Sequence, residues 1–144
     1  MPEGFQTEKW YEQLETELAA SDEKVILVGH SPGASLLVKY LSKTVVEQSV
    51  LGLFLLAPPY WGAAGWDVDE YMLEATVEST FPTELPVFVY HCRDDEIVSV
   101  VHRSQYEELL PQATTHVIES GGHQFNSDLS VVAHDIERLE KERS

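Results

Sequence analysis

The chain has 144 residues, 43% of them hydrophobic, with 9 lysines and arginines against 25 aspartates and glutamates. This composition is typical of a single globular domain over residues 1–144, and the net charge of −16 makes nucleic acid and membrane surfaces poor partners, because both require a basic footprint. A single cysteine excludes a disulfide framework and a paired-cysteine metal site, so we expect no metal and no cofactor. The sequence has neither signal-peptide features nor a long apolar run, and we therefore expect a cytoplasmic protein.

The first elements along the chain alternate between helix and strand. Apolar residues at helical spacing predict a helix over 7–20, and a uniform apolar run predicts a strand over 24–29 that is buried on both faces. Helical spacing returns over 32–43. Segment 50–57 is again uniformly apolar, which predicts a second buried strand that ends at two prolines.

The segment 60–84 is less regular than the rest of the chain. Its Asp67 and Glu70 match a capping box, and Trp66 before them can pack onto the first turn of a helix. These residues predict a helix over about 68–79, inside an insertion between the second and third strands.

The last third of the chain resumes the alternation. Segment 86–91 predicts a third strand, 100–110 a helix, and 114–118 a fourth strand. Asn126 or Ser127 is expected to cap a last helix. Its apolar face is predicted to consist of Leu129, Val132, Ile136 and Leu139.

The alternation of strands and helices predicts an α/β fold. Its expected form is a three-layer α/β/α architecture around a mostly parallel sheet of about four strands, because parallel strands are joined by helices that cover the sheet faces. The loops that leave the C-terminal ends of such strands open on one edge of the sheet, where ligands bind.

The first of these loops carries the sequence Gly29-His30-Ser31-Pro32-Gly33. A Gly-x-Ser-x-Gly sequence between a strand and a helix is the nucleophile elbow, a tight turn that exposes the serine Oγ. Both glycines are expected because side chains there would collide with the neighbouring strand and helix. The alternative interpretation is a tight glycine turn in which the serine only caps the helix.

Two further loops bring a carboxylate and a histidine to the same edge. Asp94 and Asp95 follow the third strand, and His123 follows the fourth, so that serine, aspartate and histidine occur in this order along the chain. His123 would take the proton of Ser31 as general base, and the carboxylate would orient the imidazole. The position alone does not choose between the adjacent aspartates, and His123 could instead be a surface histidine. The histidines at 91, 102, 116 and 134 show no metal-ligand spacing and are expected to be structural or solvated.

Three segments together resemble the α/β-hydrolases: residues 29–33, residues 91–98 and residues 121–123. The middle segment is similar to the family sequence His-Gly-x-x-Asp, in which the acid is the fourth residue after the histidine. This resemblance implies that the acid here is Asp95. Met1-Pro2 followed by Trp10 resembles the small YdeN-like serine hydrolases. The resemblance implies a serine hydrolase that cleaves a small carboxylic ester or a related acyl substrate.

The sequence departs from this family in two places. The family has an upstream strand, helix and loop ahead of the residues matched here, so the expected fold is an N-terminally truncated α/β-hydrolase. That loop supplies one oxyanion-hole N–H, and the residue after the serine supplies another. Here that residue is Pro32, which has no N–H, and we expect a weakened oxyanion hole.

The missing upstream strand leaves the strand 24–29 at an apolar edge of the predicted sheet. Exposed apolar edges associate with other strands, so we expect a homo-oligomer or a second chain to cover this edge. The alternative is that residue 1 is not the natural start of the protein.

Aromatic residues just past the second strand lie where the family has a lid over its substrate. Tyr60, Trp61 and Trp66 in the lid-like insertion 60–84 are therefore candidate substrate-binding residues, as is His30 in the elbow. The alternative is that the aromatic residues form only the core of the lid. For the whole chain, the alternative function is a catalytically weak or silent α/β-hydrolase-like module that acts by binding.

Overall fold

The centre of the structure is a parallel β-sheet. The computed structural model describes residues 7–20, 24–43, 50–59, 81–82, 84–98, 100 and 102–143. Four strands lie side by side in sequence order, and each neighbouring pair is parallel. The strands are β1 (Val25–His30), β2 (Val50–Leu56), β3 (Val87–Cys92) and β4 (Thr114–Ile118).

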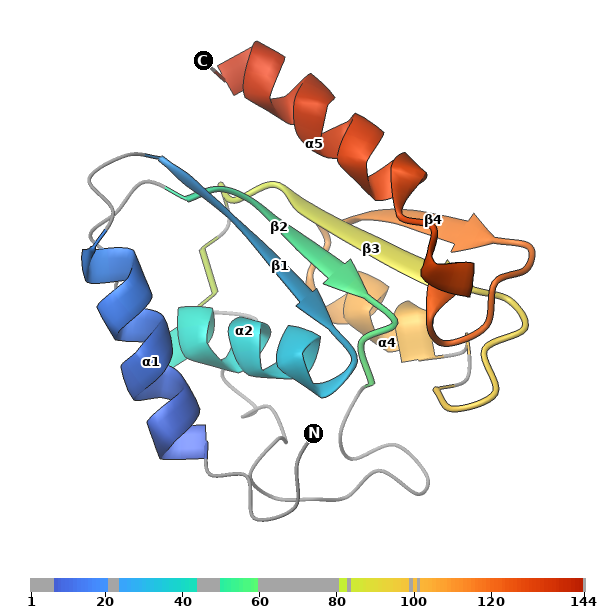
Figure 1. Ribbon diagram of the computed structural model, residues 1–144, viewed down its shortest axis with the longest axis horizontal. Coiled ribbons are helices and arrows are strands. Elements are labelled where there is room, and N and C mark those ends of the chain that lie inside the picture. The colour runs from blue at the N-terminus through green and yellow to red at the C-terminus, as the bar shows by residue number, and fades with distance from the viewer. Residues whose placement is uncertain are drawn as a thin grey trace.

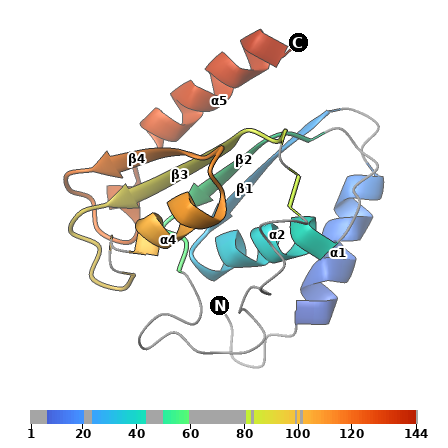
Figure 2. The ribbon, with the colours of Figure 1, turned by 180° about the vertical axis from the view of Figure 1, so that it is seen from behind.

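Helices cover both faces of this sheet. They are α1 (Thr7–Ala19), α2 (Pro32–Lys43), α4 (His102–Leu109) and α5 (Ser130–Arg143). Figure 1 shows α5 on one face of the sheet and α1, α2 and α4 on the other, and Figure 2 shows the same layers from behind. The predicted three-layer α/β/α architecture is therefore confirmed. None of the described helices has the length and apolar character needed to cross a membrane.

The two faces of β2 show why an unbroken apolar run forms a central strand. Successive side chains of a strand point to opposite faces. Leu53 and Leu55 pack into the cluster formed with α1, α2 and α4, whereas Phe54 and Leu56 pack into the cluster under α5. All four side chains are almost fully buried, so consecutive positions on both faces of the strand must be apolar.

The beginning of the last helix differs from the prediction. Asn126 and Ser127 belong to a separate 3-10 turn, η1 (Phe125–Ser127), and do not cap α5. The Asp128 carboxylate instead accepts the N–H of Ser130, 3.0 Å away. Leu129 precedes the helix and is 45% exposed, so its assignment to the buried face was wrong, whereas Val132 and Leu139 are buried as predicted.

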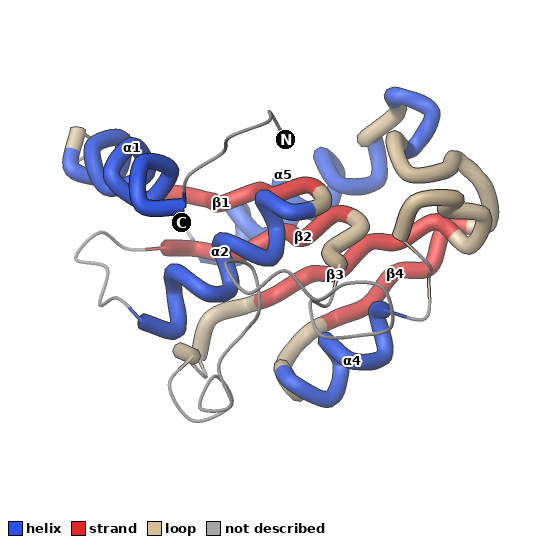
Figure 3. Tube along the Cα trace, turned by 90° about the horizontal axis from the view of Figure 1, so that it is seen from below, coloured by secondary structure: helices blue, strands red, loops and turns tan. Residues whose placement is uncertain are grey.

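The C-terminal ends of the four strands lie at the same edge of the sheet, which Figure 3 shows from below. Within the described residues, β1 pairs only with β2 and forms one edge of the sheet. Its Val28 is 48% exposed, so the prediction that this strand is buried on both faces is wrong within the described residues. The predicted apolar edge is thus present in the described part of the chain, and the chain expected to cover it stays a prediction.

The predicted insertion falls almost wholly outside the described residues. Of the segment 60–84, the structure describes only 81–82 and 84. The lid-like insertion, its helix at about 68–79 and the candidate residues Tyr60, Trp61 and Trp66 therefore stay predictions.

Candidate active site

The turn between β1 and α2 has the backbone of a nucleophile elbow. The N–H of Ser31 donates to the carbonyl of Leu56, 2.8 Å away, and so extends the pairing of β1 with β2 by one residue. Ser31 itself has a φ of 57°, in the left-handed region that non-glycine residues seldom adopt. Its carbonyl accepts the N–H of Ala34 at 3.0 Å, which starts α2 at once. A strained serine between a strand and a helix is the geometry that presents a nucleophile.

The two glycines of the elbow differ. A Cβ on Gly29 would lie 2.7 Å from the Cα of Ala34 and 2.8 Å from Cδ1 of Leu37, so only glycine fits there. A Cβ on Gly33 would have no described atom within 4 Å. The prediction that both glycines avoid collisions is therefore wrong for Gly33 within the described part of the chain.

The three residues singled out in the sequence are joined by hydrogen bonds. Nε2 of His123 lies 2.9 Å from Oγ of Ser31, and Nδ1 of His123 lies 2.9 Å from Oδ2 of Asp95. The His123 side chain is 7% exposed and the Asp95 side chain is fully buried. The loops after β1, β3 and β4 thus bring together a hydroxyl, a carboxylate and an imidazole, with the imidazole between the other two groups.

The other oxygen of Asp95 fixes its orientation. Oδ1 accepts the backbone N–H groups of Ile97 and Val98, both 2.8 Å away. These bonds leave Oδ2 for His123. The carboxylate then favours the tautomer in which Nδ1 of His123 carries the proton and Nε2 accepts the hydrogen bond of the serine.

The neighbouring Asp94 has a different partner. Its carboxylate accepts the N–H of Gly122 at 2.9 Å and that of Gly121 at 3.3 Å. These hydrogen bonds, the Gly122 bond most of all, lower the pKa of the Asp94 carboxyl. Asp94 contacts the backbone ahead of His123, and Asp95 contacts the imidazole, so the structure separates the two aspartates that the residue pattern left equivalent.

His91 lies behind the carboxylate, a contact that the sequence interpretation missed. Its Nε2 donates to the carbonyl of Val98, 2.7 Å away, and lies 3.3 Å from Oδ2 of Asp95. Burial is the main cause of the lowered pKa of His91, so the neutral ring is favoured. The spacing of four residues between His91 and Asp95, across the end of a strand, was the signal that could have indicated this contact.

His30 contacts the loop that carries His123. Its Nε2 donates to the carbonyl of His123 at 2.7 Å, and the two imidazole rings lie 4.8 Å apart between centroids. His30 is therefore at the site, but its Nε2 already has a protein partner. Its predicted role in substrate binding is untested, and within the described residues no group of histidines, cysteines and carboxylates is suited to hold a metal.

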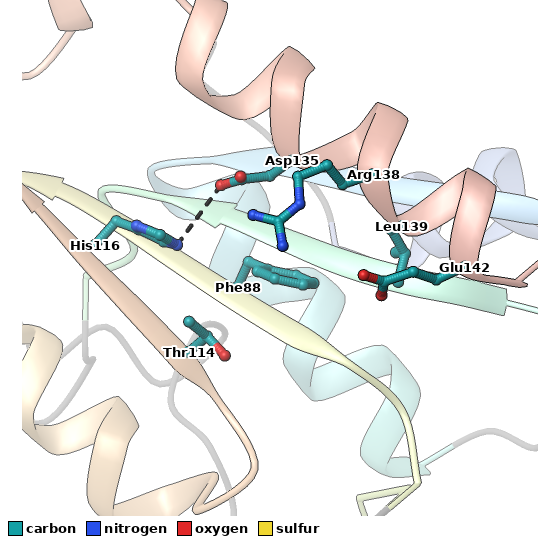
Figure 4. A pocket seen from close by; sticks show the side chains of 7 residues that line it. All are labelled: Phe88, Thr114, His116, Asp135, Arg138, Leu139 and Glu142. Carbon is teal, nitrogen blue, oxygen red and sulfur yellow. Dashed lines mark ion pairs between the residues drawn. The ribbon is translucent and has the colours of Figure 1, made fainter.

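A second polar cluster lies away from these residues, between α5 and the middle of β3 and β4. Asp135 accepts the hydroxyl of Tyr90 at 2.7 Å, and Nε2 of His116 lies 3.5 Å from the same oxygen. Figure 4 shows His116 and Asp135 facing each other. Both line a cavity of about 210 Å³. Burial and the bond to Asp135 raise the pKa of Tyr90, so the phenol remains a donor. The cluster ties α5 to the sheet and does not reach Ser31.

Comparison with known proteins places the chain in a family. The model of the serine hydrolase family matches residues 3–135. The chain belongs to this family. No curated protein matches the sequence at a significant level.

Solved structures agree with this assignment. The ydeN gene product of B. subtilis is 18% identical with a TM-score of 0.77, over 98% of this chain and 80% of that one. A sugar hydrolase, YeeB, of Lactococcus lactis is 19% identical with a TM-score of 0.73, over 99% and 73% of the two chains. A structure reported with activity profiles of carboxylesterases from Nitrososphaera gargenis is 10% identical with a TM-score of 0.73, over 96% and 74%. At these identities the likeness shows the fold, and the chain is a member of the α/β-hydrolase superfamily that resembles the ydeN product.

Proposed function

We propose that this serine hydrolase cleaves a small carboxylic ester or a related acyl compound with Ser31, His123 and Asp95. The observation that carries the proposal is the pair of 2.9 Å hydrogen bonds that join the three side chains. The carboxylesterases among the proteins of similar fold support an ester as the substrate class.

The reaction follows from the position of each group. His123 Nε2 takes the proton of Ser31 Oγ as this oxygen attacks the acyl carbonyl, and a tetrahedral intermediate forms. The imidazolium, stabilised by Asp95, returns the proton to the leaving alcohol and an acyl-serine remains. Water, deprotonated by the same imidazole, then releases the carboxylic acid and restores Ser31.

The residue after the serine favours a second candidate function. Pro32 cannot donate an N–H at the position from which this fold supplies one oxyanion-hole donor. Loss of one such donor lowers kcat by about 10²- to 10³-fold. A catalytically weak or silent module that acts by binding is therefore the alternative.

Hydrolysis of p-nitrophenyl acetate tests the first proposal. Ser31→Ala and His123→Ala should each lower the rate about 10⁴-fold or more. Ser104→Ala, at an exposed serine on α4, is the matched control and should leave the rate unchanged. A wild-type rate no greater than that of Ser31→Ala would contradict the proposal.

The substitution Pro32→Ala separates the two candidates. If the missing N–H limits an otherwise competent hydrolase, the new donor should raise kcat by about 10²-fold or more with little change in KM. If the proline is needed to start α2 with a fixed φ, the activity should fall. A chain that stays inactive with either residue at position 32 favours the binding module.

The four candidate substrate-binding residues belong to this proposal as well. Tyr60, Trp61 and Trp66 would line the acyl pocket from the insertion after β2, and His30 would border it from the elbow. Replacing the aromatic residues with alanine should raise KM more for a butyrate ester than for an acetate ester, because the longer acyl chain buries more apolar surface.

A further inference from the structure

His123 lies farther beyond the strand that precedes it than either of the other members of the candidate triad. It follows the end of β4 by five residues, after two glycines with φ values of 144° and 68°. Two hydrogen bonds close the turn on itself, from the N–H of Asn126 to the carbonyl of Gly121 and from the N–H of Phe125 to the carbonyl of Gly122. Bonds within the turn shape it but do not fix its distance from Ser31 and Asp95.

Two side chains, one from the end of β1 and one from the loop after β3, hold this backbone on either side of the imidazole. The Asp94 carboxylate accepts the N–H groups of Gly121 and Gly122, which precede His123. The His30 imidazole donates to the carbonyl of His123 itself. Among the described residues, these are the hydrogen bonds that join the backbone of 121–123 to other parts of the chain.

His30 and Asp94 occupy equivalent places in the chain. His30 directly precedes Ser31, and Asp94 directly precedes Asp95. Each partner of His123 in the candidate triad is therefore preceded by a residue that grips the backbone carrying His123. The same two turns that present the hydroxyl and the carboxylate thus also set where the base lies relative to them.

We propose that His30 and Asp94 are positioning residues that clamp the loop of His123 and keep its imidazole between Ser31 and Asp95. This inference rests on the proposed function. It gives the Nε2 of His30 a protein partner, the carbonyl of His123, so a contact of His30 with the acyl group would have to use another part of its ring. It also gives the two adjacent aspartates separate tasks, one on the ring of the base and one on its backbone.

The charge of the Asp94 carboxylate strengthens its hydrogen bonds to the loop of His123. Hydrogen bonds from the two amides favour the ionised carboxylate and lower its pKa. A charged acceptor forms stronger hydrogen bonds than a neutral one. The Asp94 carboxylate is therefore a charged acceptor for these two amides in neutral solution.

The clamp predicts a kcat effect with an unchanged KM. A misplacement of a catalytic group by about 1 Å can lower the rate about 10²-fold, so Asp94→Ala and His30→Phe should each lower kcat about 10- to 100-fold and leave KM within about twofold. Asp94→Asn, which keeps an acceptor oxygen, and His30→Gln, which keeps an N–H donor, should recover most of the activity. Glu119→Gln is the control, because this carboxylate after β4 is exposed and, among the described residues, pairs with the exposed Arg93 at 3.3 Å.

A role through His123 has a further signature. In a His123→Ala background, Asp94→Ala and His30→Phe should cause no additional loss of the residual rate, because the group that they position is absent. An equal loss in both backgrounds would overturn the inference. So would a raised KM with an unchanged kcat for His30→Phe, which is the result expected of a substrate-binding residue.

Amide hydrogen exchange tests the clamp without any need for activity. Asp94→Ala should speed exchange at the Gly122 N–H about tenfold or more and leave the amides of β3 unchanged, since the effect is local. Unchanged exchange at Gly122 would overturn the clamp. Failure of the wild-type chain to hydrolyse an ester would contradict the proposed function alone, and the exchange result would then decide the clamp.

Discussion

The two glycines of the elbow give a sharp test of the structure, because they share a motif but differ in their surroundings. An alanine Cβ at position 29 would lie 2.7 Å and 2.9 Å from the Cα and N of Ala34, and 2.8 Å from Cδ1 of Leu37. Two of these three contacts are with backbone atoms of the first turn of α2, which cannot move aside as a flexible side chain can.

The expected magnitudes follow from these contacts. Overpacking a core position typically costs about 1–3 kcal/mol, and contacts with backbone place Gly29→Ala at about 3 kcal/mol or more. Gly33 lies in the first turn of α2, is not among the positive-φ glycines, and has no described atom within 4 Å of its added Cβ. Gly33→Ala should therefore be neutral or stabilise the fold by up to about 1 kcal/mol, because alanine is the better helix former.

The free energy of unfolding in urea is the assay, followed by tryptophan fluorescence and extrapolated to zero denaturant. Gly29→Ala should lower it by about 3 kcal/mol relative to the wild type and lower the esterase rate, because the new Cβ pushes Ser31 off its turn. Gly33→Ala serves as the matched control. A stability of Gly29→Ala within about 0.5 kcal/mol of the wild type, or an equal loss for both variants, would refute this account of the elbow.

Further expectations concern stability and association. Burial lowers the pKa of His91 and of His102, so the unfolded chain binds more protons than the folded one just below the ordinary histidine pKa. The free energy of unfolding should therefore fall as the pH is lowered below about 6.5, by up to about 1.4 kcal/mol per pH unit for each histidine. In urea titrations between pH 5 and 6.5, His91→Gln should show a weaker dependence of the free energy of unfolding on pH. Tyr90→Phe should lower the free energy of unfolding by about 1.5–3 kcal/mol, because it removes a buried donor to the Asp135 carboxylate, and an unchanged urea midpoint would contradict the link between α5 and the sheet. Small-angle scattering should report more than one chain per particle if a second copy covers β1, and Val28→Lys should dissociate this oligomer without unfolding the chain; a monomeric wild type would refute the homo-oligomer.

Much of the fold could be predicted because buried strands and amphipathic helices have strong patterns. Fully apolar runs marked β1 and β2, and helical spacing marked α1 and α2, within one or two residues of the observed bounds. The candidate triad could be predicted for a related reason. Parallel strands bring their C-terminal ends to one edge, so the loops that carry Ser31, Asp95 and His123 were expected to open on the same side of the sheet.

The features that the sequence did not indicate depend on the path of loop backbone. The contact of Asp94 with Gly121 and Gly122 joins residues 27 and 28 positions apart and leaves no periodic pattern. The bond from His30 to the carbonyl of His123 is equally invisible, because every residue has a carbonyl. The helix start at Ser130 was misplaced because Asn126, Ser127 and Asp128 are all suitable caps, and only the 3-10 turn decides among them.

The structure is consistent with both roles that the sequence suggests for Pro32, in starting a helix and in weakening the oxyanion hole. The proline opens α2, where its missing N–H has no role in the helix. The same missing N–H lies next to Ser31, where the fold usually provides an oxyanion donor. A proline at this position thus favours the start of α2 but removes an N–H that would stabilise the oxyanion.

The central claim, that His123 and Asp95 activate Ser31, is tested most directly by covalent labelling with a fluorophosphonate, followed by intact-mass and peptide mass spectrometry. An activated serine should take up one phosphonyl group per chain, on the peptide that contains Ser31. Labelling should be abolished in Ser31→Ala and slowed at least about 10³-fold in His123→Ala, because the probe requires a deprotonated oxygen. Absence of labelling over hours at neutral pH, or equal labelling of the wild type and Ser31→Ala, would contradict the account.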